Sequence, residues 1–247
     1  MSIESDDDLK ALQRVGKLVS GTIRTMLAAL RPGITTRELD EVGREYFAPH
    51  GARYAPQLTY GFPGATCISV NHEAAHGIPG DRKVEPGDLV TVDVSLELNG
   101  YFADSGATKI VPPVRPDLGR LCEASYEILM RSLRELKGGS RLNQVGRTIE
   151  NESRKRGYTV IRNLAGHGVG RSLHEEPYDL VNYRVPSDRR LARTGQVVAI
   201  ETFISTGAEY VVEQPDGWTL KTPDQSYVAQ FEHTVVITNS APLVLTA

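Results

Sequence analysis

Apolar residues recur at the spacing of amphipathic helices over the first fifty residues. Between Asp8 and Leu30, leucine, valine, isoleucine and methionine return at intervals of three and four residues, and the run stops at the Arg-Pro-Gly of residues 31–33. The Thr-Thr-Arg-Glu of residues 35–38 has the pattern of a capping box, which predicts a second helix that ends at His50-Gly51. A pair of helices therefore precedes the first predicted strands.

The next feature is an apolar run that turns back on itself and carries two carboxylates. Residues 87–104 predict a β-hairpin, because Asn99-Gly100 is the dipeptide favoured in two-residue turns. That turn places Ser95 opposite Asp104, with Asp93 one pleat further along the same face. Two carboxylates this close repel in an apolar sheet, so they need a cation or shared protons. For this hairpin alone, the alternative of one exposed Asp and one Asp bonded within a turn stays open.

Turn-forming residues predict several connecting segments. We expect an ordered loop over residues 54–64, a short strand over residues 66–70, and a loop over residues 71–81 that contains His72 and His76. Residues 206–226, with their glycines and prolines, interrupt a second hairpin and are expected to hang over the site as a lid.

The second half of the chain repeats the first. A helix is predicted over residues 116–137, and Ser140 is the expected N-cap of another that ends near residues 156–157. The repeat shows at five places: residues 39–44 with 142–147, Gly51 with Gly157, residues 76–78 with 167–169, residues 87–93 with 195–201, and residues 102–104 with 231–233. The match places Glu201 at the position of Asp93, so the pair of carboxylates is duplicated.

This repeat predicts a single α+β domain over residues 1–247. Each half, about 8–111 and about 116–240, contains two helices, a strand and a hairpin, and is too small to enclose its own sheet. We expect the pseudo-symmetric halves to form one curved sheet with the helices outside and the active centre on its inner face.

The composition is that of an ordinary globular enzyme. The chain has 247 residues, of which 40% are hydrophobic and 24% charged, and its formal net charge of -3 gives no attraction to nucleic acid or to an anionic membrane. No apolar run approaches roughly 18 residues, so no membrane span is expected. Two cysteines are too few for a disulfide framework, and the acidic N-terminus is unlike a secretory signal, which favours the cytoplasm.

Four strand carboxylates predict a metal centre. Asp93, Asp104, Glu201 and Glu232 cannot all ionise in a partly dry cleft without a divalent cation, and four negative charges suit two such ions. His167 lies between glycines, which leave its imidazole uncrowded. Carboxylates with one imidazole favour Mn(II), Fe(II), Co(II) or Zn(II) over a structural zinc site built from thiolates.

The other histidines divide into two groups. His76, which the repeat places opposite His167, and His174 are candidates for acid-base or hydrogen-bonding roles. We expect His72 to be structural and His50 to be a cationic residue at a helix C-terminus. His233 neighbours Glu232 on a strand, so it points to the opposite face and is not expected to bind metal.

These motifs resemble the signature of the type I methionine aminopeptidases. The resemblance runs over nearly the whole chain and rests on six spaced motifs: Asn71 with His76-Gly-Ile-Pro79, Asp93 with Asp104, Gly166-His-Gly-Val-Gly170, His174-Glu-Glu-Pro177, Glu201, and Gln230-Phe-Glu-His233. It implies the pita-bread fold. Prolidases, aminopeptidase P and creatinase belong to the same wider group but carry an additional N-terminal domain, and type II enzymes carry a helical insertion not seen here.

The resemblance implies a metal-dependent aminopeptidase that removes N-terminal methionine from nascent proteins or peptides. The implied cofactors are two divalent ions (Co, Mn, Fe or Zn) that activate a water. By this mapping Asp93 chelates one ion, and Asp104 and Glu232 bridge both. His167 and Glu201 complete the coordination of the other.

The resemblance also implies roles on the substrate side. Glu201 would act as general base, His174 would hydrogen-bond the carbonyl oxygen in the transition state, and His76 would bind the scissile amide. The implied partners are peptide or nascent-protein N-termini, with transient ribosome association as an open extension, in a monomeric cytoplasmic protein. No membrane or sequence-specific nucleic-acid partner is expected.

The residues around these motifs depart from the usual pattern in the pocket. Thr202 follows Glu201 where proline is usual, Phe203 stands where methionine is common, and Leu173 stands where an aromatic residue is usual. Thr59 and Phe62 stand where tyrosines are common. The expected pocket for the first residue is apolar: Phe62, Cys67, Leu173, Phe203 and Trp218. Two alternatives therefore stay open, a pita-bread paralogue with another N-terminal specificity and a pita-bread binding protein without catalysis. Plain core packing also stays open for each pocket residue.

Overall fold

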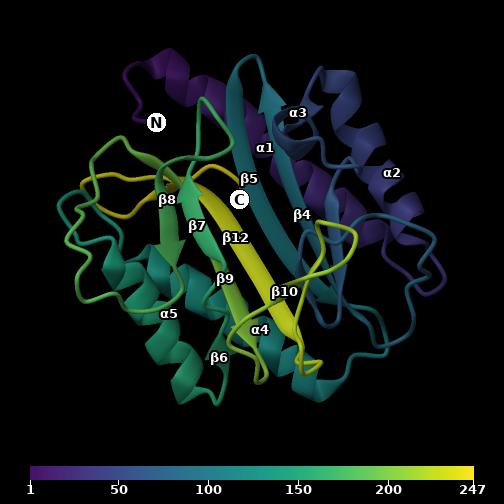
Figure 1. The fold of residues 1–247 in the computed structure, drawn as a ribbon. Coiled ribbons are helices and arrows are strands. Elements are labelled where there is room, and N and C mark those ends of the chain that lie inside the picture. Colours follow the sequence, from purple (N-terminus) through teal and green to yellow (C-terminus); the bar gives the residue numbers. More distant parts are fainter.

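Two long antiparallel hairpins, one from each half of the chain, lie at the centre of the structure. The computed structural model describes residues 1–247, and Figure 1 shows β5 beside β12 along the middle of the molecule. The first hairpin joins β4 (Leu89–Leu98) to β5 (Tyr101–Ile110), and the second joins β9 (Val197–Ser205) to β12 (Val228–Val236). This mixture of packed helices and antiparallel strands confirms the predicted α+β class.

The first hairpin has the predicted register. Asn99 and Gly100 have φ values of 53° and 79°, and two positive values are what a type I′ turn requires of its central residues. Ser95 pairs with Asp104, and Asp93 pairs with Gly106 two positions further along. The turn therefore fixes the spacing of the two carboxylates along the sheet.

The two hairpins meet along a seam of hydroxyl groups. The backbone ladders form one sheet around β4 and another around β9 and β12, and no ladder joins β5 to β12. Instead, Ser105 and Thr108 donate their hydroxyls to carbonyls of β12, at 2.5 and 2.6 Å, and the Thr234 hydroxyl donates to the carbonyl of Asp104 at 2.7 Å. We expected one curved sheet. In the structure, side-chain hydrogen bonds between β5 and β12 join two separate sheets at that position.

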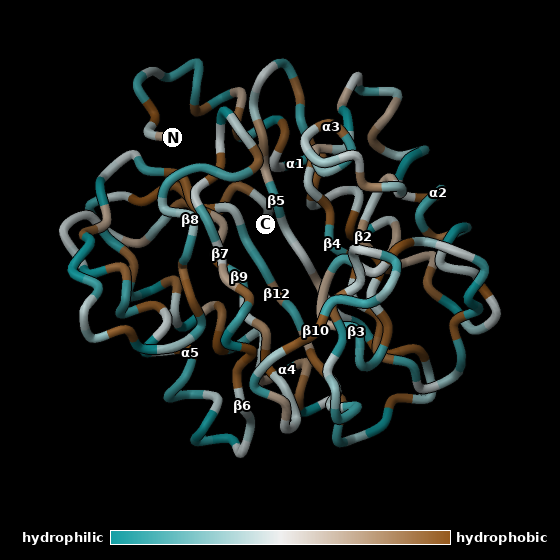
Figure 2. Tube along the Cα trace, in the orientation of Figure 1, coloured by the Kyte–Doolittle hydropathy of each residue, from teal (hydrophilic) through white to brown (hydrophobic).

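Helices cover one face of the paired hairpins. Figure 1 shows them behind the central strands, with α1 (Asp6–Ala29) against β4 and β5, and α4 (Pro116–Leu133) against β9 and β12. The partner helices α2 (Thr36–Phe47) and α5 (Asn143–Lys155) pack on α1 and α4. A cluster of 21 buried hydrophobic residues lies in each half. Figure 2 shows that the middle of β12, by contrast, is hydrophilic.

Three local predictions need correction. The segment 54–64 contains a short helix, α3 (Ala55–Tyr60), because Pro56 suits a helical first turn and Gly61, with φ 75°, ends it. The segment 71–81 contains β3 (Glu73–Ala75), which pairs with β11 (Leu220–Lys221).

Ser140 is not an N-cap, since its hydroxyl donates to the carbonyl of Lys137 at 2.7 Å and α5 begins only at Asn143. The capping box of Thr35 and Glu38 is confirmed.

The remaining elements are short. They are the 3₁₀ helix η1 (Ala48–His50) and the strands β1 (Arg53–Tyr54), β2 (Cys67–Val70), β6 (Thr159–Val160), β7 (Ala165–Gly168), β8 (Glu175–Val181), β10 (Val212–Glu213) and β13 (Leu243–Val244). β7 lies between β8 and β9, so its residues are placed next to those of β9 in the second sheet. None of the helices has both the length and the apolar composition needed to cross a membrane.

The glycines of the duplicated helix motif differ in what they contact. A Cβ at Gly146 would lie 2.3 Å from the carbonyl oxygen of Val181 and 2.4 Å from that of Tyr183, whereas one at Gly43 would meet the Met26 sulfur at 2.7 Å. The first obstacle is rigid backbone and the second is a flexible thioether.

We therefore expect Gly146→Ala to destabilise the protein by about 1–3 kcal/mol. Gly43→Ala should have a smaller effect, because the helical preference of alanine, about 1 kcal/mol, offsets the displacement of Met26. Urea unfolding of both variants measures the difference. Equal losses of unfolding free energy in the two variants would mean that stability does not depend on the close approach of α5 to the carbonyls of Val181 and Tyr183.

Candidate active site

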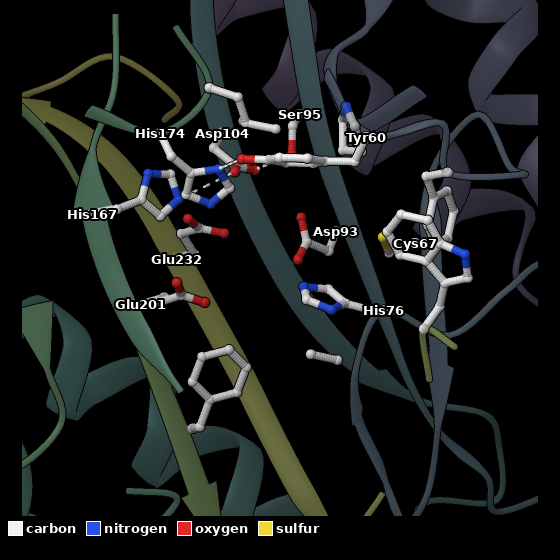
Figure 3. A pocket seen from close by; sticks show the side chains of 16 residues that line it. Tyr60, Cys67, His76, Asp93, Ser95, Asp104, His167, His174, Glu201 and Glu232 are labelled. Atoms are coloured by element: carbon white, nitrogen blue, oxygen red, sulfur yellow. Dashed lines mark hydrogen bonds and ion pairs between the residues drawn. The ribbon is translucent and has the colours of Figure 1, made fainter. Parts of the chain in front are cut away.

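A cavity of about 130 Å³ is lined by residues of both hairpins and by none of the long helices α1, α2, α4 and α5. Figure 3 shows side chains from both halves pointing into it. Its lining includes all twelve residues to which the sequence assigned ligand, catalytic or pocket roles: Phe62, Cys67, His76, Asp93, Asp104, His167, Leu173, His174, Glu201, Phe203, Trp218 and Glu232. Residues separated by up to 170 positions in the chain are thus brought to one place.

The four carboxylates come from the two hairpins, two from each. Asp93 and Asp104 share one face of the β4–β5 pair, and Glu201 lies directly opposite Glu232 on the β9–β12 pair. Ser95 donates its hydroxyl to Oδ1 of Asp104 at 2.7 Å. The hydroxyl seam holds β5 against β12, so the two pairs of carboxylates face the same space.

The electrostatics of this cluster do not permit four ionised carboxylates without a cation. Burial, reinforced by the neighbouring carboxylates, raises the pKa of Asp93, Glu201 and Glu232 well above the usual range. Burial acts on Asp104 in the same direction, but the nearby His167 imidazole and the hydrogen bond from the Ser95 hydroxyl together lower its pKa. In these three groups, burial and the neighbouring carboxylates favour the neutral form, and a positive charge entering the site would favour the ionised form.

The donor atoms fit a divalent ion. Ligand atoms of Asp104, His167 and Glu232 all lie within 4.8 Å of one another, and all three residues are buried. The Oε1 of Glu232 is buried without any hydrogen-bond partner, which is unusual for a carboxylate oxygen. Nδ1 of His167 is 2.9 Å from the carbonyl oxygen of Gly168, while Nε2 is 3.7 Å from Asp104. The imidazole is thus oriented in the way that metal-binding histidines usually are.

The glycines beside His167 are required by the packing of β7. A Cβ at Gly166 would lie 2.4 Å from the carbonyl oxygen of Ala199 on β9, and one at Gly168 would lie 2.4 Å from that of Glu176 on β8. The neighbouring strands can approach His167 closely from both sides only because these positions lack side chains.

Gln230 is a site residue that the sequence analysis missed. Its Nε2 lies 3.1 Å from Asp93 and 3.3 Å from Glu201, so one amide group bridges carboxylates of the two hairpins. Its position two residues before Glu232 on the same strand places both side chains on one face, and this alternation was the signal that could have identified it. Ser95, whose position opposite Asp104 was expected, and Tyr60 also line the cavity.

The two further candidate histidines lie at different walls of the cavity. Figure 3 shows His76 beside Asp93, and His174 beside His167 on the opposite side. The rings of His174 and His167 have their centroids 4.0 Å apart. Burial and the neighbouring imidazole of His167 lower the pKa of His174 to about 4, and burial lowers that of His76. Both imidazoles are therefore neutral near pH 7 and can donate or accept one hydrogen bond at each nitrogen.

The remaining histidines lie outside the cavity. His72 packs its ring against Tyr227 with centroids 5.0 Å apart, and His50 ends the 3₁₀ helix that follows α2. His233 lies 3.0 Å from the Thr246 hydroxyl through its Nδ1. None of these three shares the space between the carboxylates.

One end of the cavity is apolar. Phe62 and Trp218 meet edge to face with ring centroids 5.1 Å apart, and the hydroxyl of Tyr54 lies 3.1 Å from the sulfur of Cys67. Burial raises the pKa of the Cys67 thiol well above its usual range, so it remains a neutral part of the wall. Leu173 and Phe203, both buried, also line the cavity. The cavity thus places an apolar pocket next to a cluster of carboxylates.

The segment predicted as a lid is part of a small sheet. β10 pairs with β11, which pairs with β3, so residues 206–226 are fixed beside the cavity. Asp216 accepts hydrogen bonds from the backbone N–H groups of Trp218 and Thr219, each at 2.9 Å. This turn directs Trp218 into the wall of the apolar pocket.

Comparison with known proteins identifies chains of similar sequence and fold. The profile of Metallopeptidase family M24 matches residues 10–239. "Methionine aminopeptidase 2" of Bacillus subtilis (strain 168) is 45% identical over 247 residues, which cover 100% of this chain and 99% of that protein. Crystal structures of methionine aminopeptidases from Rickettsia prowazekii and Thermotoga maritima each superpose with a TM-score of 0.95, at 31% and 35% identity. Each alignment covers 100% of this chain, and 100% and 99% of the respective structures.

Proposed function

The chain belongs to metallopeptidase family M24, and on this premise we propose that it is a methionine aminopeptidase. It hydrolyses the first peptide bond of peptides and proteins that begin with methionine. The observation that carries this conclusion is the cavity itself, in which an apolar pocket adjoins four carboxylates and an imidazole. An apolar pocket accepts the methionine side chain, and the carboxylates next to it hold the cations that hydrolysis of an unactivated amide needs.

Five residues would hold the metal. Asp93 would hold one ion, His167 and Glu201 would hold the other, and Asp104 and Glu232 would contribute to both. The close donor atoms of Asp104, His167 and Glu232, and the unpartnered Oε1 of Glu232, support this proposal for those three residues. When bound, the ions would lower the pKa of a water and polarise the scissile carbonyl.

The chain supplies the proton transfers and the orientation of the substrate. Glu201 is the general base that takes a proton from the attacking water and passes it to the leaving amine. His174 donates a hydrogen bond to the carbonyl oxygen as that oxygen gains charge, and His76 binds the scissile amide. Phe62 and Trp218 exclude water around the methionine side chain and fix the bond to be cleaved beside the carboxylates.

The cellular setting follows from this substrate. Nascent proteins begin with methionine and emerge in the cytoplasm, so we place the enzyme there and propose transient association with the ribosome. We propose that it acts as a monomer.

An altered N-terminal specificity is the second candidate. It is supported by Leu173 and Phe203, which stand at pocket positions where the family commonly has other residues and which are both buried in the wall. A binding protein without catalysis would not need to retain five metal-binding side chains and two histidines in one cavity.

Peptide hydrolysis tests these possibilities directly. The EDTA-treated protein, reloaded with Co(II), Mn(II), Fe(II) or Zn(II), is assayed with Met-Gly-Met-Met and with matched peptides that begin with leucine or proline. We expect release of methionine from the first peptide with at least one metal, and none with EDTA. Cleavage of only a non-methionine peptide would establish the altered specificity, and no cleavage under any condition would support the binding protein.

A further inference from the structure

Tyr60 reaches from the first half of the chain to a histidine of the second. Its hydroxyl oxygen lies 2.6 Å from Nδ1 of His174, and the two rings are 5.7 Å apart at an angle of 47°. Figure 3 shows Tyr60 extending across the cavity towards His174, with the hydrogen bond drawn between them. This is the hydrogen bond that the structure gives to the His174 ring, so the phenol is its polar anchor.

The direction of this hydrogen bond follows from the chemistry of the two groups. A phenol donates one proton, and a neutral imidazole has one nitrogen that accepts and one that carries hydrogen. A phenolic O–H is the more acidic of the two donors, so the favoured pairing is donation from Tyr60 to Nδ1. The imidazole proton then resides on Nε2, the nitrogen that the phenol leaves free.

We propose that Tyr60 is a positioning residue, whose hydroxyl holds His174 in the tautomer that presents Nε2–H to the carbonyl oxygen of the substrate. The inference rests on the proposed function, because that function assigns His174 the role of donor. Tyr60 itself need not touch the reacting atoms. Without its hydroxyl, Nδ1–H and Nε2–H forms would compete, and only the second can donate into the cavity.

The backbone on both sides of this contact is fixed. Helix α3 ends at Gly61, whose N–H bonds the carbonyl of Gln57, and the next residue, Phe62, is buried. On the other side, Oε1 of Glu175 accepts from the backbone N–H groups of Arg171 and Ser172, at 2.6 and 2.7 Å. Both ends of the bond are therefore held in place by their own segments, although the Tyr60 side chain is 51% exposed.

Tyr60→Phe removes the hydroxyl and little else. We expect kcat for Met-Gly-Met-Met to fall about tenfold, the effect of losing one hydrogen bond, with KM changed less than about twofold. Calorimetric metal binding should remain that of the unaltered protein. Tyr210→Phe is the matched control, since Tyr210 is an exposed tyrosine outside the cavity lining and should keep full activity. An unchanged kcat in Tyr60→Phe, or a fall shared by Tyr210→Phe, would overturn the proposal.

A double-mutant cycle shows whether Tyr60 acts through His174. In the His174→Ala background, Tyr60→Phe should lower kcat no further, because the group that it orients is gone. A second tenfold loss in that background would mean that Tyr60 acts independently of His174, and the proposal would fail.

The tautomer can also be read without any turnover. In the metal-free protein, ¹⁵N chemical shifts of the His174 ring should report protonated Nε2 and unprotonated Nδ1, and Tyr60→Phe should shift both nitrogens towards the average of the two tautomers. Unchanged shifts would overturn the positioning role. This measurement separates the inference from the proposed function. A protein that hydrolyses no peptide contradicts the function, whereas the ring shifts test the Tyr60 contact alone.

Discussion

Asp104→Asn and Glu232→Gln should each abolish the tight binding of two divalent ions and reduce peptide hydrolysis to background. Each carboxylate is assigned to both ions, and each is almost completely buried, at 6% and 2% exposure. An amide carries no charge to balance a cation in this environment. Replacing a residue that hydrogen-bonds a metal ligand weakens metal affinity about 10- to 100-fold. Replacing a carboxylate that binds both ions should weaken metal affinity by more than this.

Calorimetric titration of the EDTA-treated variants with Co(II) or Mn(II) measures the effect. The unaltered protein should bind two equivalents, and its melting temperature should rise with metal, since an ion at about 100 times its Kd stabilises the folded state by about 2.7 kcal/mol. In the variants the stoichiometry should fall and most of the thermal stabilisation should disappear. Without metal, Glu232→Gln should be no less stable than the unaltered protein, because Oε1 of Glu232 is buried without a hydrogen-bond partner. Asp104→Asn should lose some stability, because Ser95 and His167 stabilise the charged form of Asp104.

Glu97→Gln is the matched control for these variants. Glu97 lies on the same strand as Asp93, is also buried, and pairs with Arg53 at 2.7 Å outside the cavity. It should lose some stability but still bind two ions. Two tightly bound equivalents in Asp104→Asn or Glu232→Gln would show that the ligand assignment is wrong, whereas loss of metal in Glu97→Gln would show that the assay reports the integrity of the hairpin.

The parts of the site that the sequence predicted are those fixed by local geometry. The Asn99-Gly100 turn determines the register of its hairpin, and the two-residue period of a strand then determines which side chains share a face with Asp104. The repeat carried the same reasoning to Glu201 and Glu232, which do lie opposite each other. Position along a regular strand is therefore sufficient to predict each pair of carboxylates within its own hairpin.

The parts that the sequence did not predict depend on contacts between segments. Tyr60 was included in an expected loop, and nothing near it in the chain indicates a partner 114 residues away. The hydroxyl seam likewise depends on the apposition of β5 and β12, since Ser105 and Thr108 alone read as ordinary strand residues. The error at Ser140 has a local cause. Its hydroxyl bonds to the backbone of Lys137 in a turn, so it does not cap the helix that follows.

His174→Ala and His167→Ala should have different signatures although the two rings are only 4.0 Å apart. If His174 donates mainly to the charged oxygen of the transition state, its removal should lower kcat by roughly 10²-fold or more with little change in KM. Metal content should be intact. His167→Ala removes a ligand, so metal affinity and activity should fall together, with partial recovery at high metal concentration.

The structure gives a physical reason for this division. Nε2 of His167 is directed at Asp104, 3.7 Å away, within the set of donor atoms that suits a cation. Nδ1 of His174 is engaged by Tyr60, at the edge of the cavity, and its ring belongs to no such set. Steady-state kinetics and bound metal for both variants decide the matter. If His174→Ala loses metal while His167→Ala retains it, the ligand and the donor have been exchanged, and the positioning role of Tyr60 would then concern a metal ligand.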